Sequence, residues 1–151
     1  RLVIVGDGQL VKDLKKQTAQ LNLTRQVAFV GRVAHNDVDR YFSIIDMVCL
    51  PRKAFTVCEL VSPLKPLEAM ALGIPVLVSS VKAMAEMIVH KETGLIFEKD
   101  NIDSLCESIT FAVDNPKKLS EIAANAKANV LSDRTWTSVL KPLLKEYEVL
   151  A

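Results

Sequence analysis

The sequence predicts an α/β protein built on a parallel sheet, because short β-branched runs alternate with helical segments as far as Phe97. Five runs have the length and composition of buried strands, at residues 1–5, 27–30, 46–50, 75–78 and 94–97. Segments with helical spacing of apolar residues lie between them, at 9–21, 36–44, 66–72 and 82–89. This alternation favours a Rossmann-like, doubly wound sheet with helices on both faces.

The sequence after Phe97 predicts three further helices and no strand. Each helix has an apolar stripe, within residues 102–113, 119–130 and 136–147. Asn101, Asn115 with Pro116, and Ser132 with Asp133 are the expected helix starts. No linker or repeat divides the chain, so residues 1–151 are predicted to form one domain.

Composition excludes several functional classes. The chain has 19 basic and 18 acidic residues, which gives no basic field for binding a nucleic acid. Its three cysteines lack the spacing of a metal site or a disulfide framework, so we expect no metal and a reduced, cytoplasmic location. No apolar run reaches the ~18 residues of a membrane span, and any membrane contact is expected to be peripheral.

Two strand ends carry glycines that could lie near a ligand, since ligands of open α/β sheets bind beyond the carboxyl ends of the strands. Gly6 and Gly8 begin a dinucleotide fingerprint whose third glycine is replaced by Val11, and a tight turn at the strand-to-helix junction explains them without a ligand. Gly31 and Arg32 follow the second strand. Arg32 is either a contact to a phosphate or base, or a solvated loop residue.

The segment "SPLKPLEAMALG", residues 62–73, predicts an anion site at a helix start. Pro66 disfavours a helical conformation at Lys65, so Lys65 is the expected N-cap and Pro66 the first helical residue. Lysine accepts no hydrogen bond, and the first amides of the helix are therefore left for water or an anion such as phosphate.

Glu68, in the first turn of this helix, has two interpretations that spacing alone does not separate. Its carboxylate either complements the helix dipole or accepts hydrogen bonds from two neighbouring hydroxyls of a ligand, as in ribose recognition. Gly73 is expected in the left-handed position that ends the helix. Met70, Met84 and Met87 are expected to fill the core.

The ordered set of motifs resembles the carboxyl-terminal, donor-binding domain of GT-B glycosyltransferases of the family 4 type. The motifs that carry this resemblance are "IVGDG", "VAFVGRV", "YFSIIDMVCLPR", "LEAMALGIPVLVSS", "AEMI" and "TGLIFEKDNIDSL". The resemblance implies a two-domain enzyme that transfers a sugar with retention and without a metal or other cofactor. The donor would be a nucleotide-diphosphate sugar of UDP or GDP type, and the acceptor a glycan, lipid or other hydroxyl, as in polysaccharide biosynthesis.

The resemblance also implies roles for individual residues. Glu68 would hold the ribose hydroxyls, and Leu64 and Lys65 would lie near the diphosphate, where Lys65 would act in catalysis. The strand-end loop of Gly31, Arg32 and Val33 would lie beside the base, and Glu86 would be structural.

The sequence departs from the family pattern at the expected first glutamate. Leu60 stands eight positions before Glu68, where that glutamate should be, and Glu59 is one residue away and is a second catalytic candidate. Arg52 and Ser62 are further candidates for holding the sugar.

A first strand and helix and an acceptor domain, which precede "IVGDG" in the family, are not in this sequence, so we expect a fragment that is inactive alone. Two alternatives remain open at this stage. One is a nucleotide-sugar epimerase of the same architecture, and the other is a nucleotide-binding module without catalysis.

Overall fold

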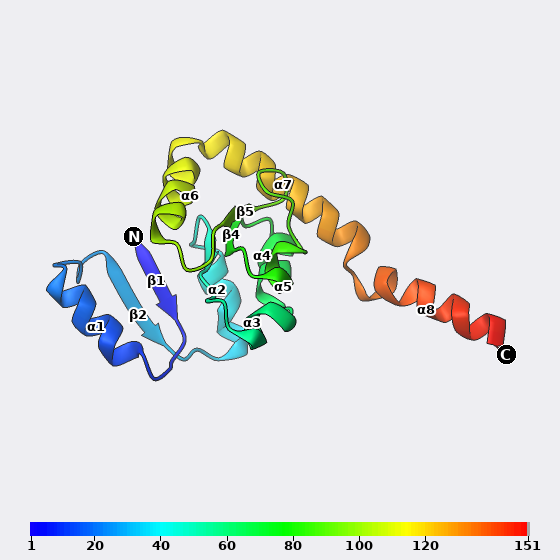
Figure 1. Cartoon of the computed structure of the whole chain (residues 1–151), viewed down its shortest axis with the longest axis horizontal. Helices are drawn as coiled ribbons and strands as arrows, with labels where there is room; N and C mark the ends of the chain where they lie inside the picture. The colour runs from blue at the N-terminus through cyan, green and yellow to red at the C-terminus, as the bar shows by residue number, and fades with distance from the viewer. Residues whose placement is uncertain (151) are drawn as a thin grey trace. The chain divides into compact units, whose positions relative to one another are not determined.

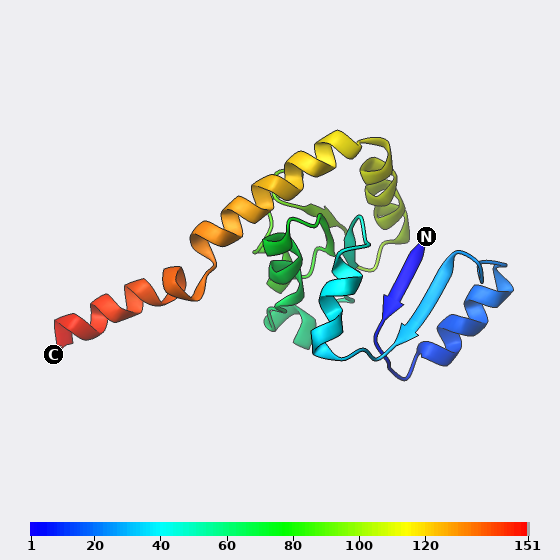
Figure 2. The ribbon, with the colours of Figure 1, turned by 180° about the vertical axis from the view of Figure 1, so that it is seen from behind.

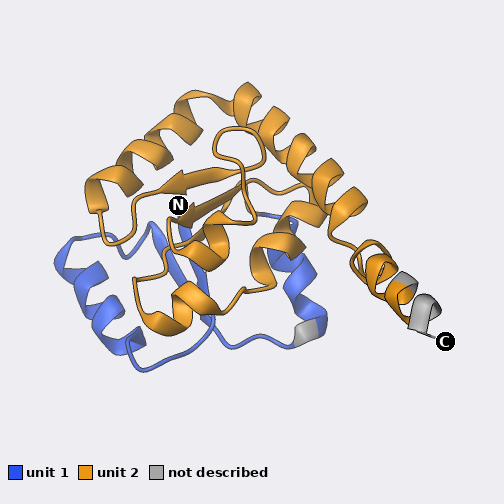
Figure 3. Ribbon diagram, turned by 45° about the vertical axis from the view of Figure 1, so that its right-hand side comes forward, with its two compact units in different colours: residues 1–44 blue, residues 45–151 orange. Residues whose placement is uncertain are grey.

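The computed structural model describes residues 1–150, apart from the side chains of residues 35, 145 and 148–150. The chain divides into two compact units, residues 1–44 and 45–151 (Figure 3). Each unit contains a parallel sheet, so the α/β class with parallel strands is confirmed. The strands pair in two sheets rather than in the single sheet that was predicted.

Unit 1, residues 1–44, consists of a two-stranded sheet and short helices. Its elements are β1 (Leu2–Val5), α1 (Val11–Gln20), β2 (Val27–Gly31), the 3₁₀ turn η1 (His35–Asp37) and α2 (Val38–Phe42). β1 and β2 are parallel, with Leu2 opposite Val27 and a shift of register between Ile4 and Val5. Among its described side chains none is fully buried, and Leu2, Val3 and Val5 of β1 are exposed.

Unit 2, residues 45–151, is built on a three-stranded parallel sheet in the order β3-β4-β5. Its strands are β3 (Val48–Leu50), β4 (Val76–Ser79) and β5 (Leu95–Phe97). Leu77 of the central strand lies between Cys49 and Leu95. All four residues of β4 are buried, as expected for a parallel strand that is covered on both faces.

Six helices of unit 2 are described (Figures 1 and 2). They are α3 (Thr56–Leu60), α4 (Lys65–Leu72), α5 (Lys82–Ala85), α6 (Ile102–Asp114), α7 (Pro116–Asp133) and α8 (Trp136–Leu150). α4 contacts β3 and β4, α5 contacts β4, and α6 contacts β5, while α7 contacts both α4 and α6. One core cluster joins β4 and β5 to α6 and α7, through Leu77, Leu95, Phe97, Ala112 and Ile122.

Most predicted elements lie within a few residues of their observed bounds, and the methionines at 70, 84 and 87 are buried as predicted. The five-residue helix α3 was not predicted. The third predicted stripe begins at Trp136, as α8 does, but its predicted cap is wrong: α7 continues through Ser132 and Asp133, and the hydroxyl of Thr135 accepts a hydrogen bond from the Ser138 amide at the start of α8.

Candidate functional site

The candidate site lies in unit 2, around the loops that follow the carboxyl ends of β3, β4 and β5. Because parallel strands end on the same edge of a sheet, these loops lie together, and open α/β sheets bind ligands at this edge. The loop after β3 leads into α3 and then into α4. The N-terminus of α4 is therefore the first feature to consider.

Helix α4 begins with unpaired amides. Leu64 is the N-cap residue with φ −78° and ψ −25°, and no side chain caps the helix. The prediction that Lys65 is the N-cap is wrong, because the helix already includes Lys65 and Pro66 is its second residue. Proline disfavours the α region for the preceding residue without forbidding it, and the second amide of a helix has no intrahelical partner to lose.

The first turn of α4 presents both charged side chains to solvent while the helix body is held in the core. Lys65 and Glu68 are exposed, whereas Pro66, Ala69 and Met70 are buried. Gly73 ends the helix with φ +79°, which confirms the predicted left-handed position. The position of α4 is therefore fixed by packing, and its first-turn charges are accessible to a ligand.

The segment from Val61 to Leu64 joins α3 to α4 and holds two of the predicted contacts. Ser62 and Leu64 are exposed. Arg52, after β3, donates from Nη1 to the carbonyl oxygen of Val61 at 3.4 Å. The guanidinium of Arg52 thus contacts the protein's own backbone beside the helix start.

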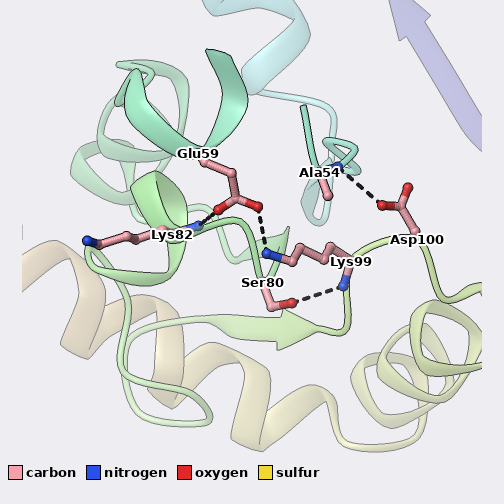
Figure 4. Close-up of polar contacts among 6 residues, drawn as sticks. All are labelled: Ala54, Glu59, Ser80, Lys82, Lys99 and Asp100. Atoms are coloured by element: carbon pink, nitrogen blue, oxygen red, sulfur yellow. Dashed lines mark hydrogen bonds and ion pairs between the residues drawn. The ribbon is translucent and has the colours of Figure 1, made fainter. Parts of the chain in front are cut away.

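Glu59 of α3 has protein partners for both carboxylate oxygens (Figure 4). Lys99, after β5, donates from Nζ to Oε1 at 2.6 Å, and the backbone N–H of Lys82 donates to Oε2 at 2.7 Å. The hydrogen bond from the Lys82 amide, together with that from Lys99, lowers the pKa of Glu59. The hydrogen bond to Glu59 in turn raises the pKa of Lys99.

Two more hydrogen bonds connect the strand-end loops around this ion pair (Figure 4). The backbone N–H of Lys99 donates to Ser80 Oγ at 2.9 Å, which joins the loops after β4 and β5. The backbone N–H of Ala54 donates to Asp100 Oδ2 at 3.2 Å, which joins the loops after β3 and β5. Asp100 has a positive φ of 59°, a conformation that aspartate tolerates better than most residues.

The structure places the predicted site residues in both units. Arg52, Glu59, Ser62, Leu64, Lys65 and Glu68 lie in unit 2, on or next to α3 and α4. Gly31, Arg32 and Val33 lie in unit 1, at the end of β2. Gly31 has φ +82° and accepts a hydrogen bond from the Gly6 amide at 2.8 Å, so it needs the freedom of glycine.

Sequence reasoning missed Ser80, Lys99 and Asp100. All three follow the carboxyl ends of β4 and β5, so the strand-end rule already pointed to their loops. No spacing in the sequence identified Glu59 as the partner of Lys99, forty residues away.

The described residues do not meet the requirements of a metal site, a disulfide or a membrane-spanning helix. Among the described residues, no three histidine, cysteine or acidic side chains lie together as a metal site would require. All three cysteines are free, and burial raises the pKa of Cys49. In the same part of the chain, no helix is both long and apolar enough to cross a membrane.

The fold is that of an α/β protein whose candidate site lies at the carboxyl edge of a parallel sheet, beside an uncapped helix start. The sequence model of the family "Glycosyl transferases group 1" matches residues 1–129. The chain therefore belongs to this glycosyltransferase family.

Individual relatives agree with this assignment. An uncharacterized glycosyltransferase of Methanocaldococcus jannaschii is 29% identical over 149 residues, which cover 99% of this chain and 37% of that protein. HepE of Anabaena, solved in complex with UDP-glucose, is 25% identical with a TM-score of 0.80, and the match covers 99% of this chain and 40% of HepE. The chain thus spans well under half of these relatives.

One similar solved structure consists of a carboxyl-terminal domain. The carboxyl-terminal domain of a group 1 glycosyl transferase from Francisella tularensis has a TM-score of 0.76 at 23% identity. The match covers 89% of this chain and 69% of that domain. The chain therefore has the fold of a carboxyl-terminal glycosyltransferase domain of GT-B type.

Proposed function

We propose that this chain is the donor-binding part of a retaining glycosyltransferase that moves a sugar from a nucleotide-diphosphate sugar to an acceptor hydroxyl. The observation that carries the proposal is the uncapped start of α4, with Lys65 and Glu68 exposed in its first turn. The comparisons support it, since the family consists of glycosyltransferases and one similar structure holds UDP-glucose.

The start of α4 has the electrostatics of a diphosphate site. A helix N-terminus has a partial positive charge and N–H donors that point outward. Within the described residues, the amides of Lys65 and Leu67 have no hydrogen-bond acceptor, and Lys65 adds a full positive charge. We assign the diphosphate to these groups and to the neighbouring Leu64.

Glu68 fits a different part of the same ligand. A carboxylate would repel phosphate oxygens, whereas it accepts hydrogen bonds from a pair of hydroxyls. Glu68 is exposed on the turn of helix that follows Lys65. We therefore assign the ribose hydroxyls to Glu68.

The chemical step that these groups would assist is departure of the nucleoside diphosphate. Negative charge grows on the diphosphate as the bond to the sugar breaks, and fixed donors stabilise such charge without reorganising. The amides of α4 and the ammonium group of Lys65 would supply part of this stabilisation. Lys65 is thus the catalytic residue that we propose in this chain.

The other predicted contacts remain proposals. Ser62 belongs to the segment that leads into α4, and Arg52 contacts that segment at Val61, so we assign both to the sugar. Gly31, Arg32 and Val33 form the strand-end loop of unit 1 that we assign to the base. For Glu59, which was predicted to be catalytic, the contacts favour an indirect role, developed below. The nature of the base, the sugar and the acceptor is left to experiment, with UDP and GDP as the first nucleotides to test.

The test is calorimetric titration of the chain with UDP, GDP and ADP, followed by variants on the nucleotide that binds best. We expect Lys65→Met to weaken binding of the diphosphate more than binding of the nucleoside. We expect the wild-type chain to prefer the ribonucleotide to its 2′-deoxy form, and Glu68→Ala to remove this preference.

Asp103→Ala is the matched control, because Asp103 is also an exposed first-turn acid, on helix α6. If Glu68 only complemented the helix dipole, both substitutions would lower stability alike and neither would change the ribose preference. Failure of all three nucleotides to bind the wild-type chain would refute the proposed site.

A further inference from the structure

Helix α3 carries Glu59, which forms an ion pair with Lys99. α3 is five residues long and has no buried residue. Its exposed apolar side chains include Val57 and Leu60, which are 62% and 75% exposed. A helix this short is marginal by itself, and a segment with little buried apolar surface opens easily. α3 does pack against α5, but because none of its residues is buried this packing gives it only a weak anchor.

The Glu59 carboxylate connects α3 to the rest of unit 2 by polar contacts. Its two oxygens bind groups on two other segments, the start of α5 through Lys82 N and the loop after β5 through Lys99 Nζ. The side chains of Glu59 and Lys99 are only 25% and 33% exposed, so water screens their interaction less than at a fully exposed pair. The short contact between two charged groups is of the strong, charge-assisted type.

The loop that holds Lys99 is itself fixed. Lys99 N donates to Ser80 Oγ, and Asp100 accepts from the Ala54 amide. The ammonium group of Lys99 is therefore presented from a loop that is connected to the ends of all three strands of the sheet. Through its bond to Glu59, this ammonium group fixes α3 relative to the carboxyl edge of the sheet.

The end of α3 sets the path of the chain into α4. Residues 61–64 are all that separate Leu60 from Lys65. From Pro66 onward α4 is held by its own buried residues, whereas Ser62 and Leu64 are exposed and depend on where α3 ends. Moving α3 would therefore displace the residues at the mouth of the proposed diphosphate site without unfolding α4.

We propose that Glu59 and Lys99 are positioning residues, which set the affinity for the nucleotide-diphosphate sugar by holding α3 and residues 61–64 beside the start of α4 without touching the ligand. This inference rests on the proposed function. It also accounts for a carboxylate that comes shortly before the proposed anion site in the chain, because Lys99 forms an ion pair with it. Lys99 had no place in the sequence-based site, and Glu59 changes from a catalytic candidate to a supporting residue.

The experiment measures nucleotide-sugar affinity for Glu59→Gln, Lys99→Met and the double variant in the full 151-residue chain. We expect each single substitution to weaken binding about tenfold, which corresponds to about 1.4 kcal/mol of binding free energy. The double variant should bind no more weakly than either single one, because one interaction is lost in all three. Lys99→Arg should restore affinity, since it keeps the charge.

Lys118→Met is the matched control, because Lys118 forms an ion pair with Glu121 on the surface of α7. It should leave affinity unchanged. Amide hydrogen exchange of residues 56–64 should accelerate in Lys99→Met and not in Lys118→Met. These two results together separate a positioning role from a general effect of removing a lysine.

Three outcomes would overturn the proposal. A lower melting temperature with unchanged affinity would show a merely structural ion pair. Weaker binding by Lys99→Met together with unchanged or tighter binding by Glu59→Gln would show that Lys99 contacts the ligand directly. Absence of binding by the wild-type chain would refute the proposed function and this inference with it, whereas the first two outcomes leave the proposed function intact.

Discussion

Replacing Gly94 by alanine tests the packing that holds β5 against the rest of unit 2. Gly94 is buried directly before β5. A Cβ atom added there would lie 2.8 Å from Ile88 Cγ2, 3.0 Å from Val76 Cγ2 and 3.3 Å from Ile88 Cδ1. Optimal carbon–carbon separations are about 3.5–4.0 Å, so β4, β5 or the Ile88 side chain must move.

The expected size of the effect follows from two opposing contributions. Overpacking a well-filled core costs about 1–3 kcal/mol. Replacing glycine by alanine also restricts the unfolded chain, which returns about 0.4–1 kcal/mol. We therefore expect Gly94→Ala to lower the free energy of unfolding by about 1–2 kcal/mol.

The measurement is urea unfolding followed by circular dichroism. Gly8→Ala is the control, because a Cβ at Gly8 meets nothing within 4 Å, and we expect it to change stability by less than about 1 kcal/mol in the stabilising direction. Ile88→Ala combined with Gly94→Ala should cost less than the sum of the two single changes, since it removes the two Ile88 atoms that the added Cβ would meet and leaves only Val76 Cγ2. An unchanged free energy of unfolding in Gly94→Ala would refute the packing argument.

Two further predictions concern a helix cap and a histidine. Asn101→Ala should lower the free energy of unfolding by about 1 kcal/mol, because Asn101 Oδ1 accepts a hydrogen bond from the Ser104 amide at the start of α6. Asn101→Asp should retain most of the wild-type stability, since aspartate also caps helices. An equal loss of stability in both variants would contradict the capping role. Burial, and then the charge of Lys91, lower the pKa of His90, so the folded state binds fewer protons than the unfolded state and stability should fall as pH drops below about 6.5. His90→Gln should reduce this pH dependence in urea titrations, and an identical profile would contradict it.

The strands were predictable because buried parallel strands are short continuous apolar runs, and β4 is the clearest case. The pairing of the strands was not, since such runs carry no information about which neighbour each will have. Helix α3 is five residues long, too short for its apolar residues Val57 and Leu60 to establish a helical period. Its position depends on bonds from Glu59 to distant residues, which only the folded chain brings together.

The candidate site was predictable where a local rule applied. Pro66 marks a helix start, and the residues around it identified Lys65 and Glu68 as its exposed charges. The helix boundary differed by one residue, because the restriction before proline is a preference. Ser80, Lys99 and Asp100 could not be assigned, since their role depends on the loops of three strands meeting at one edge.

The absence of any fully buried side chain among the described residues of unit 1 has a consequence for how stability is distributed along the chain. Apolar burial is the main driving force of folding, and the fully buried apolar residues described here all belong to unit 2. The β1-β2 ladder is therefore expected to open at a lower free energy than β3-β4-β5, as a separate unit of local unfolding. A ligand that binds the loop at Gly31 only while the β1-β2 ladder is intact would stabilise unit 1 against this local opening. Amide exchange in unit 1 would then slow as the ligand concentration rises above the dissociation constant.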